Sequence, residues 1–324
     1  MKSIEKLYEN GLLPIISLDN EDAALEIIES ILKGGIECLA INYKNNNTFN
    51  VIRSIKESYP DILIGVFGIF EIDQLYEAKK SCVNFIITSI IDEKIISASL
   101  KEGIDVYPLC VDMHDIYNVR KMGLDHLVVN LQGVSDKISY INSLSYLYKD
   151  MKFIIIDEKS DNNLSFYCRS KNIIAISGSW ITGNISMNNK SNEELSTKVN
   201  SELLSMLDFR LAHIGINCEN LEESRKVANS FEYFFGFNQN ENPGSIFNDS
   251  YIEVLKSPFL GVMGHIAIST NSVERAKAYL ERKGLSFNPD TLNYNDESML
   301  QTVYTKEEIG GFAIHLVRRK IEVN

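Results

Sequence analysis

Residues 12–179 alternate between short apolar segments and longer amphipathic ones. Eight apolar segments of five to seven residues occur in this range, and each has the length of a strand but no polar face. Strands of that kind are typical of a parallel sheet that is covered by helices. The segments are Leu12–Ser17, Cys38–Tyr43, Leu63–Gly68, Phe85–Ser89, Val106–Val111, Leu127–Leu131, Phe153–Asp157 and Ile173–Ser179.

Helix-like stretches such as Glu21–Leu32, Asp73–Lys80 and Asp92–Lys101 lie between these segments. Strict β-α alternation over about 200 residues predicts a (β/α)8 TIM barrel. A doubly wound open sheet is the alternative, but it more usually carries a glycine-rich turn after its first strand. Here that turn is SLDNED, without glycine. We therefore expect an α/β barrel.

The end of this domain is marked by a helix signal. Ser191 followed by Glu194 is a capping-box pattern, and we expect the helix that it opens to run to about Leu207 and to close the barrel. This predicts a first domain at 1–207 and a second at 208–324.

The second domain contains an internal repeat. One half-unit opens with A-H-I-G-I at 212–216 and the other with G-H-I-A-I at 264–268, and each continues as a helix and further strands. Repeats of this kind predict two copies of one supersecondary unit packed against each other. We expect an α+β domain with a βαβββ repeat.

Four metal-ligand side chains occupy matching places in this repeat. His213 and His265 each lie in the first strand of a half-unit, whereas Glu253 and His315 each lie in a last strand. A pseudo-symmetric pair would bring all four together on one concave face. Three imidazoles and a carboxylate are ligands for Zn²⁺, Ni²⁺, Mn²⁺ or Fe²⁺.

Three sequence patterns in the second domain resemble those of a known family. They are the two H-I-x-I openings, F-x-x-x-F-G-F at 231–237 and G-G-F-A-I-H-L at 310–316. Over its whole length this segment is similar to the glyoxalase/bleomycin-resistance/extradiol-dioxygenase family, also called the vicinal-oxygen-chelate family. The resemblance implies a metal at the four positions, with open sites for oxygen atoms of a substrate. The family's usual fourth ligand is a glutamate, which is His315 here. Many members bind no metal, so a metal-free binding module stays open.

The first domain carries a second resemblance, in G-L-L-P-I-I at 11–16, G-G-I-E-C-L at 34–39, F-I-I-T-S at 85–89 and S-G-S-W at 177–180. It resembles the class I aldolases that cleave 2-keto-3-deoxy-6-phosphogluconate (KDPG) and 4-hydroxy-2-oxoglutarate (KHG). Some members of that family are joined to a vicinal-oxygen-chelate-like domain, so the two resemblances support each other.

The chemistry that this resemblance implies does not carry over. The family's Schiff-base lysine on strand six falls on Val128, its acid/base glutamate on Ala40 and its arginine on Lys44. Of the phosphate loops only Ser177-Gly178-Ser179-Trp180 remains. We therefore expect a degenerate aldolase barrel that serves as a scaffold or binds a small polar metabolite. The mouth residues that could bind it are Asn42, Lys44, Thr88, Asp112, Asn130, Ser177, Gly178 and Ser179.

Two alternatives remain open. One is an active lyase that cleaves 2-keto-4-hydroxy acids to pyruvate through another amine, for which Lys44 and Lys159 are the candidates. The other is a metalloenzyme of glyoxalase or dioxygenase type that acts through the second domain.

Composition limits the partners. The net charge is −12 and no basic cluster exceeds Arg318–Lys320, so nucleic-acid binding is not expected. No apolar run reaches the roughly 18 residues of a membrane helix. Five scattered cysteines, with no C-x-x-C pair, favour a reducing cytoplasm. We expect no organic cofactor, and a homo-oligomer, trimer or dimer, with Phe70, Tyr76 and Tyr117 as candidate contacts.

Overall fold

The computed structural model describes residues 3–18, 20–158, 163–183 and 191–319. The chain divides into two compact units, Met1–Met206 and Leu207–Asn324, one residue away from the boundary expected from the sequence. None of the helices in the described ranges is long and apolar enough to cross a membrane.

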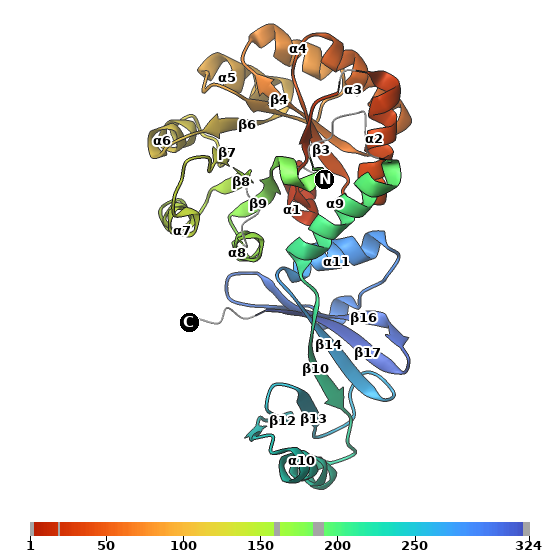
Figure 1. Ribbon diagram of the computed structural model, residues 1–324. Coiled ribbons are helices and arrows are strands. Elements are labelled where there is room, and N and C mark those ends of the chain that lie inside the picture. The colour runs from red at the N-terminus through yellow and green to blue at the C-terminus, as the bar shows by residue number, and fades with distance from the viewer. Residues whose placement is uncertain (1–2, 19, 159–162, 184–190, 320–324) are drawn as a thin grey trace. The chain divides into compact units, whose positions relative to one another are not determined.

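The N-terminal unit is a ring of parallel strands (Figure 1). Its first strand is interrupted at Leu13-Pro14, so that β1 (Gly11–Leu12) pairs with β9 while β2 (Ile15–Ile16) pairs with β3. The same strand therefore joins both ends of the sheet, and the expected (β/α) barrel is confirmed. The other strands are β3 (Cys38–Asn42), β4 (Leu63–Ile69), β5 (Phe85–Thr88), β6 (Asp105–Cys110), β7 (His126–Asn130), β8 (Lys152–Ile156) and β9 (Ile173–Ser177).

Helices follow the strands, as the alternation predicts. The predicted capping box is present at the start of α9, because Glu194 N donates to Ser191 Oγ at 3.2 Å and Ser191 N donates to the Glu194 carboxylate at 3.0 Å. The helices are α1 (Ser3–Asn10), α2 (Glu21–Lys33), α3 (Asn47–Ser58), α4 (Ile72–Lys80), α5 (Glu93–Glu102), α6 (Met113–Lys121), α7 (Lys137–Leu147), α8 (Leu164–Arg169) and α9 (Asn192–Leu207), with a 3-10 turn at Ser179–Ile181.

Large side chains fill the barrel core. The ring of Phe85 lies directly over Gly65, where a Cβ would overlap it. Phe85 also packs edge-on against Tyr107 with ring centroids 5.6 Å apart, and both side chains are fully buried. The interior is therefore a packed core rather than a pore.

The C-terminal unit contains the predicted βαβββ repeat. The first copy is β10 (Arg210–Ile216), α10 (Leu221–Phe235), β11 (Gln239–Glu241), β12 (Ser245–Asn248) and β13 (Ile252–Leu255). The second is β14 (Gly264–Thr270), α11 (Val273–Arg282), β15 (Asn293–Tyr294), β16 (Leu300–Ile309) and β17 (Phe312–Arg318), with a 3-10 turn at Pro289–Thr291. The order β11-β12-β13-β10-β14-β17-β16-β15 places the copies symmetrically about the antiparallel β10–β14 pair.

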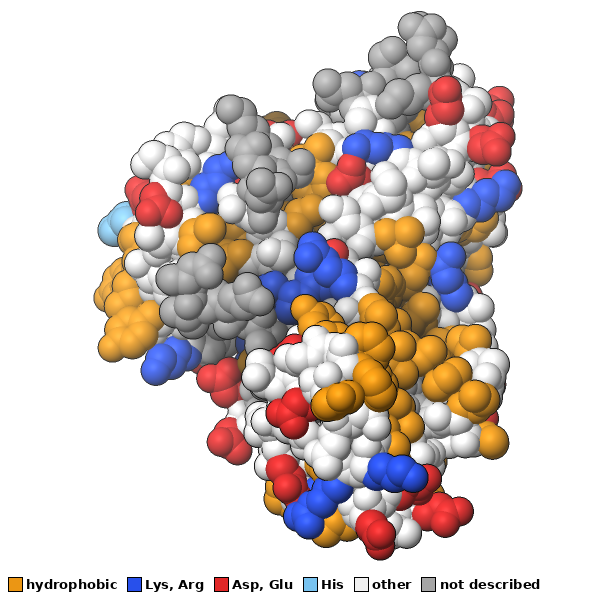
Figure 2. Space-filling model, turned by 60° about the horizontal axis from the view of Figure 1, so that its bottom comes forward, with side chains coloured by type: hydrophobic (Ala, Val, Ile, Leu, Met, Phe, Trp, Pro, Cys, Tyr) orange, Lys and Arg blue, Asp and Glu red, His pale blue; other side chains and the backbone are white. Residues whose placement is uncertain are grey.

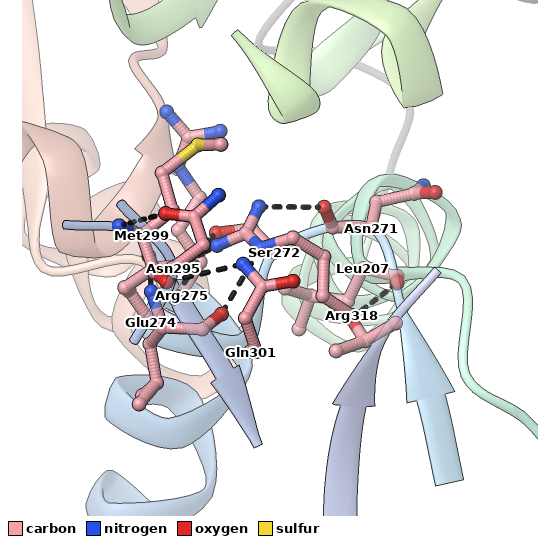
Figure 3. Close-up of polar contacts among 11 residues, drawn as sticks. Leu207, Asn271, Ser272, Glu274, Arg275, Asn295, Met299, Gln301 and Arg318 are labelled. Atoms are coloured by element: carbon pink, nitrogen blue, oxygen red, sulfur yellow. Dashed lines mark hydrogen bonds and ion pairs between the residues drawn. The ribbon is translucent and has the colours of Figure 1, made fainter. Parts of the chain in front are cut away.

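A polar network fastens the start of α11 to the strands of the second copy (Figure 3). The Glu274 carboxylate accepts from Leu300 N at 2.7 Å and pairs with the Arg318 guanidinium. Arg318 Nε in turn donates to the Leu300 carbonyl at 3.0 Å. A helix and two strands far apart in sequence are thus joined by charge-assisted bonds, which are stronger than neutral ones.

Candidate functional sites of the barrel and the C-terminal sheet

The barrel positions that the aldolase resemblance assigns to catalysis hold apolar, buried side chains. Val128 in β7 and Ala40 in β3 are both fully buried. A valine cannot form an imine with a keto group, and an alanine cannot move a proton. The structure thus shows no chemical group at either position that could replace the missing side chain.

Several expected mouth residues are engaged locally. Asn42 donates to Ser17 Oγ at 3.0 Å, Asn130 accepts from Gln132 N at 2.9 Å, and Asp112 caps α6 through Asp115 N at 2.9 Å. Thr88 is fully buried, and its hydroxyl has no hydrogen-bond partner among the described residues. The polar groups of these residues are therefore used in local contacts or buried, and they do not form one binding site. Of the two candidate amines, Lys44 is exposed and Lys159 lies outside the described residues.

The surviving S-G-S-W loop is already occupied by a side chain of the same unit. Ser179 donates to the Glu158 carboxylate through N at 3.0 Å and through Oγ at 2.6 Å. Gly178 lies against the Trp180 ring, where a Cβ would overlap it. Ser177 is buried, and its hydroxyl has no partner in the described part of the chain. Because a carboxylate accepts the Ser179 donors, an anionic ligand would have to displace it.

One amine at the strand ends was not predicted from the sequence. Lys137, the first residue of α7, donates to Asp157 Oδ1 at 2.7 Å, and Tyr167 donates to Oδ2 at 2.9 Å. The Lys137 and Asp157 side chains are 16% and 4% exposed. This ion pair engages the Lys137 amine, which would have to leave Asp157 before it could attack a keto group. No local motif connects residues twenty positions apart, so only the fold reveals the pair.

The C-terminal sheet brings all four predicted metal-ligand residues together. Strand register explains how, because Gly215 pairs with both Glu253 and His265 in one cross-strand row. In the next row on the same face, Ala267 pairs with both His213 and His315. Each row thus places a small residue between two ligand-type side chains, which leaves room for them to converge.

Two local features place the first pair of imidazoles. The register of β10 against β14 shifts between Leu211 and His213, which is the signature of a β-bulge beside a site. The His265 ring lies over Gly215, where a Cβ would overlap three of its ring atoms. A bulge and a glycine therefore position His213 and His265 with their rings nearly perpendicular and their Nε2 atoms close together.

Three donor atoms form a tight triangle. His213 Nε2 lies 3.2 Å from His265 Nε2, Glu253 Oε2 lies 3.2 Å from His213 Nε2, and Glu253 Oε2 lies 3.1 Å from His265 Nε2. His315 completes the cluster, since ligand atoms of the three histidines all lie within 4.8 Å of one another. The cluster, here called the histidine centre, consists of His213, Glu253, His265 and His315.

Burial shapes the charges of the histidine centre. Burial would raise the pKa of Glu253, but hydrogen bonds from two histidines and Ser245 outweigh it and hold the pKa well below its usual range. Burial, together with the neighbouring imidazoles, lowers the pKa of His315 to about 3. At neutral pH the centre thus holds an ionised carboxylate and a neutral His315. Neither ring nitrogen of His315 has a hydrogen-bond partner among the described residues.

Aromatic rings surround the histidine centre, which the sequence did not predict. Tyr304 stacks flat on His315, with centroids 4.5 Å apart and planes 9° apart. Phe247 packs edge-on against His213, and Phe259 packs edge-on against Tyr304. Burial raises the pKa of Tyr304 to about 12, so its phenol remains a hydrogen-bond donor at neutral pH. The side chains of His213 and Glu253 are the more exposed members of the centre, at 14% and 17%.

The comparisons with known proteins concern the barrel. The sequence profile of the aldolase family described as KDPG and KHG aldolase matches residues 4–197, which is more than half of the chain. A 2-dehydro-3-deoxy-phosphogluconate aldolase of Haemophilus influenzae is 25% identical over 177 residues, or 55% of this chain and 84% of that protein. A KHG/KDPG aldolase of Escherichia coli K12 is 19% identical over 180 residues, with the same shares.

Solved structures agree on the fold. A KDPG aldolase from Legionella pneumophila, with pyruvate captured as a covalent carbinolamine intermediate, matches with a TM-score of 0.57 and 18% identity over 62% of this chain and 98% of that one. A KDPG aldolase of Zymomonas mobilis ZM4 with 3-phosphoglycerate matches with a TM-score of 0.56 and 14% identity, over 62% and 94%. Through its N-terminal barrel, the chain belongs to the KDPG and KHG aldolase family.

Proposed function

We propose that the barrel of this chain has lost imine chemistry at the family position and that its C-terminal unit binds a divalent metal ion. The ligands are the four side chains of the histidine centre, and the candidate ions are Zn²⁺, Ni²⁺, Mn²⁺ and Fe²⁺. The C-terminal unit is then a vicinal-oxygen-chelate module, as its two βαβββ copies suggest, and any chemistry of the protein lies there.

The donor triangle carries this proposal. If His213 and His265 both carry a proton on Nε2, both donate to Glu253, but two N–H groups then face each other. If one of these nitrogens is unprotonated, its lone pair faces the ionised carboxylate instead. No proton arrangement makes all three edges attractive, whereas a single cation among the three donors does. The triangle therefore fits a metal better than it fits hydrogen bonding alone.

The spacing of the donors fits as well. Bonds of about 2.0–2.2 Å to nitrogen and oxygen place neighbouring ligands of tetrahedral or octahedral ions about 3.0–3.5 Å apart. The three edges of the triangle, at 3.1–3.2 Å, fall inside this range.

A bound divalent ion would act as a Lewis acid on oxygen ligands of a substrate. The chain itself supplies orientation and charge. Glu253 offsets one unit of positive charge, and the stacked Tyr304 holds the His315 ring in place. The Tyr304 phenol remains protonated and can donate to an oxygen that carries negative charge.

Metal content tests the proposal directly. The full chain, purified without chelator, should bind about one equivalent of metal by mass spectrometry or by titration with each ion. Removal of a residue that only hydrogen-bonds to a metal ligand already lowers metal affinity about 10- to 100-fold. His213→Ala or His265→Ala should therefore cost more than about 100-fold. The control is His114→Ala, which changes an exposed histidine on α6. The proposal is wrong if none of the four ions binds, or if the site variants bind like the control.

The barrel half of the proposal has a separate test. In the Legionella relative, pyruvate is captured as a covalent carbinolamine. A carbinolamine loses water to give an imine, and borohydride reduction of the imine leaves a stable adduct on the amine. We expect no adduct when this chain is treated with pyruvate and borohydride and its intact mass is measured. An adduct mapped to Lys137 or Lys44 would instead support the active-lyase alternative. The metal result does not depend on this outcome.

A further inference from the structure

The end of helix α10 carries a cluster of aromatic side chains outside the histidine centre. Ring contacts link Phe231 to Phe235, Phe235 to Phe237 and Phe237 to Tyr251, with centroids 5.7–6.1 Å apart. Tyr233 and Phe234 are a second contacting pair at 5.1 Å. These side chains are here called the aromatic patch: Phe231, Tyr233, Phe234, Phe235, Phe237 and Tyr251.

The aromatic patch faces outward. Tyr233, Phe234, Phe235 and Tyr251 are 83%, 71%, 66% and 58% exposed. Figure 2 turns the α10 end of this unit toward the viewer and shows hydrophobic side chains gathered over part of its surface. Because a whole aromatic side chain offers about 150–250 Å², the four rings expose about 550 Å². This area is near the upper end of the largest apolar patch on a typical soluble monomer, and such patches are often functional.

The patch is not needed for the core of its own unit. The buried residues of α10 are Ser224 and Ala228, which lie in its first two turns. Ala228 joins a small core cluster with Cys218, Ile246 and Val254. The last turn of the helix extends past this cluster and ends at Gly236, a left-handed C-cap. Its aromatic residues therefore contribute little to packing, and burial by the same unit does not explain them.

We propose that the aromatic patch is the contact surface between two copies of this chain, related by a two-fold axis. A stable interface buries about 800 Å² per partner, and the four exposed rings supply about two thirds of that area. The six side chains of the patch carry no charge, and Glu232, which lies among them in the chain, accepts a hydrogen bond from Gln239 of the same copy. The aromatic surface can therefore contact its own symmetry copy, as a two-fold contact requires. Aromatic rings at the centre of an interface, with polar groups at its edge, are the usual energetic arrangement.

Acidic side chains at the edge of the patch have partners within their own copy. Glu232 accepts from Gln239 Nε2 at 2.8 Å, and Asp249 accepts from Asn238 N at 3.1 Å. Two copies can therefore approach without leaving these carboxylates unbonded. These two carboxylates could therefore form part of a polar border around the aromatic centre of the contact.

Sedimentation of the full chain tests the proposal. We expect the double variant Phe234→Glu/Phe235→Glu to have half the mass of the parent protein and a dissociation constant raised at least about 100-fold, since central aromatic residues dominate such contacts. If the barrels also associate and the assembly is closed, loss of the two-fold contact still halves the mass. The control Tyr146→Glu/Leu147→Glu adds the same two charges at neighbouring residues of α7 that are 73% and 55% exposed, and it should leave the mass unchanged.

A milder variant keeps the test informative if two added charges disturb the fold. Tyr233→Ser alone should weaken pairing about tenfold and leave the thermal unfolding of dilute protein unchanged. Equal masses for the parent and both patch variants would overturn the proposal, and so would a parent that sediments as a single chain at all concentrations. Those results would show that the patch does not pair two copies of this chain. The metal content of the histidine centre does not enter this test.

Discussion

Replacement of Gly215 by alanine tests how the histidine centre is assembled. A Cβ at this position would lie closer than 3.0 Å to Cε1, Nδ1 and Nε2 of His265. The nearest of these atoms would lie 2.0 Å from the Cβ. Ordinary carbon contacts are about 3.5–4.0 Å, so the imidazole would have to move by roughly 1.5 Å. Metal–ligand distances tolerate only about 0.2 Å. His265 is 1% exposed, so a displaced ring would press on the protein atoms that enclose it.

We therefore expect Gly215→Ala to weaken metal binding more than about 100-fold, as removal of His265 would. Crowding a packed site by one methyl group should also destabilise the metal-free C-terminal unit by about 1–3 kcal/mol. Calorimetric titration with Zn²⁺ measures the first effect, and urea unfolding measures the second. Gly244→Ala is the matched control, because a Cβ there has no heavy atom within 4 Å.

A double variant separates the clash from other effects of the substitution. Combining Gly215→Ala with His265→Ala removes the overlapping ring, so the double variant should be more stable than Gly215→Ala alone while still failing to bind metal. Wild-type metal affinity in Gly215→Ala would refute the argument that this glycine makes room for the imidazole. Equal stability of the single and double variants would refute the steric explanation.

Three further changes test other parts of the structure. Burial raises the pKa of Asp208, but hydrogen bonds and charge from Arg210 and Arg319 outweigh it and hold the pKa below its usual value. The stabilisation is therefore present at pH 7 and is lost progressively as the pH falls below about 4 and through the lowered pKa. Asp208→Asn should cost about 1 kcal/mol at pH 7 and less as the pH falls below about 4 in urea unfolding. Asn220 caps α10, and Asn220→Ala should cost about 1 kcal/mol in the same assay. His315→Glu places a carboxylate beneath the Tyr304 ring without a donor, and calorimetric melting should show a metal-free unit destabilised by about 2 kcal/mol or more, with the loss reduced by added Zn²⁺.

Hydrophobic pattern predicted the barrel because strand length and burial are local properties. The segment Leu12–Ser17 was recognised as one strand, but not its interruption at Leu13-Pro14, which lets it pair with both β9 and β3. That interruption depends on which strands become neighbours, and no local pattern encodes this. The repeat likewise predicted the topology of the second unit, because each copy carries the same strand and helix signals.

The two candidate sites differ in how far sequence could predict them. The histidine centre could be predicted because residues at matching places in two copies of a repeat occupy equivalent places in the fold. His213 and His265 are such a pair. Lys137 and Asp157 belong to no repeat, and their contact arises only when α7 packs beside β8. The part played by Gly215 was also invisible, since a glycine in a strand signals a close approach but does not name the neighbour.

Glu253 and His315 occupy equivalent places in the two copies of the repeat but are different residue types. The environment of each position explains the difference. Glu253 is partly exposed and receives hydrogen bonds from the two facing histidines, so an ionised carboxylate is satisfied there. His315 is 6% exposed and lies under the flat face of Tyr304. An imidazole can stack on that ring and stay neutral, whereas an ionised carboxylate would lose its hydration without compensation. The repeat therefore sets where the four side chains meet, and the burial of each position determines whether it holds a carboxylate or an imidazole.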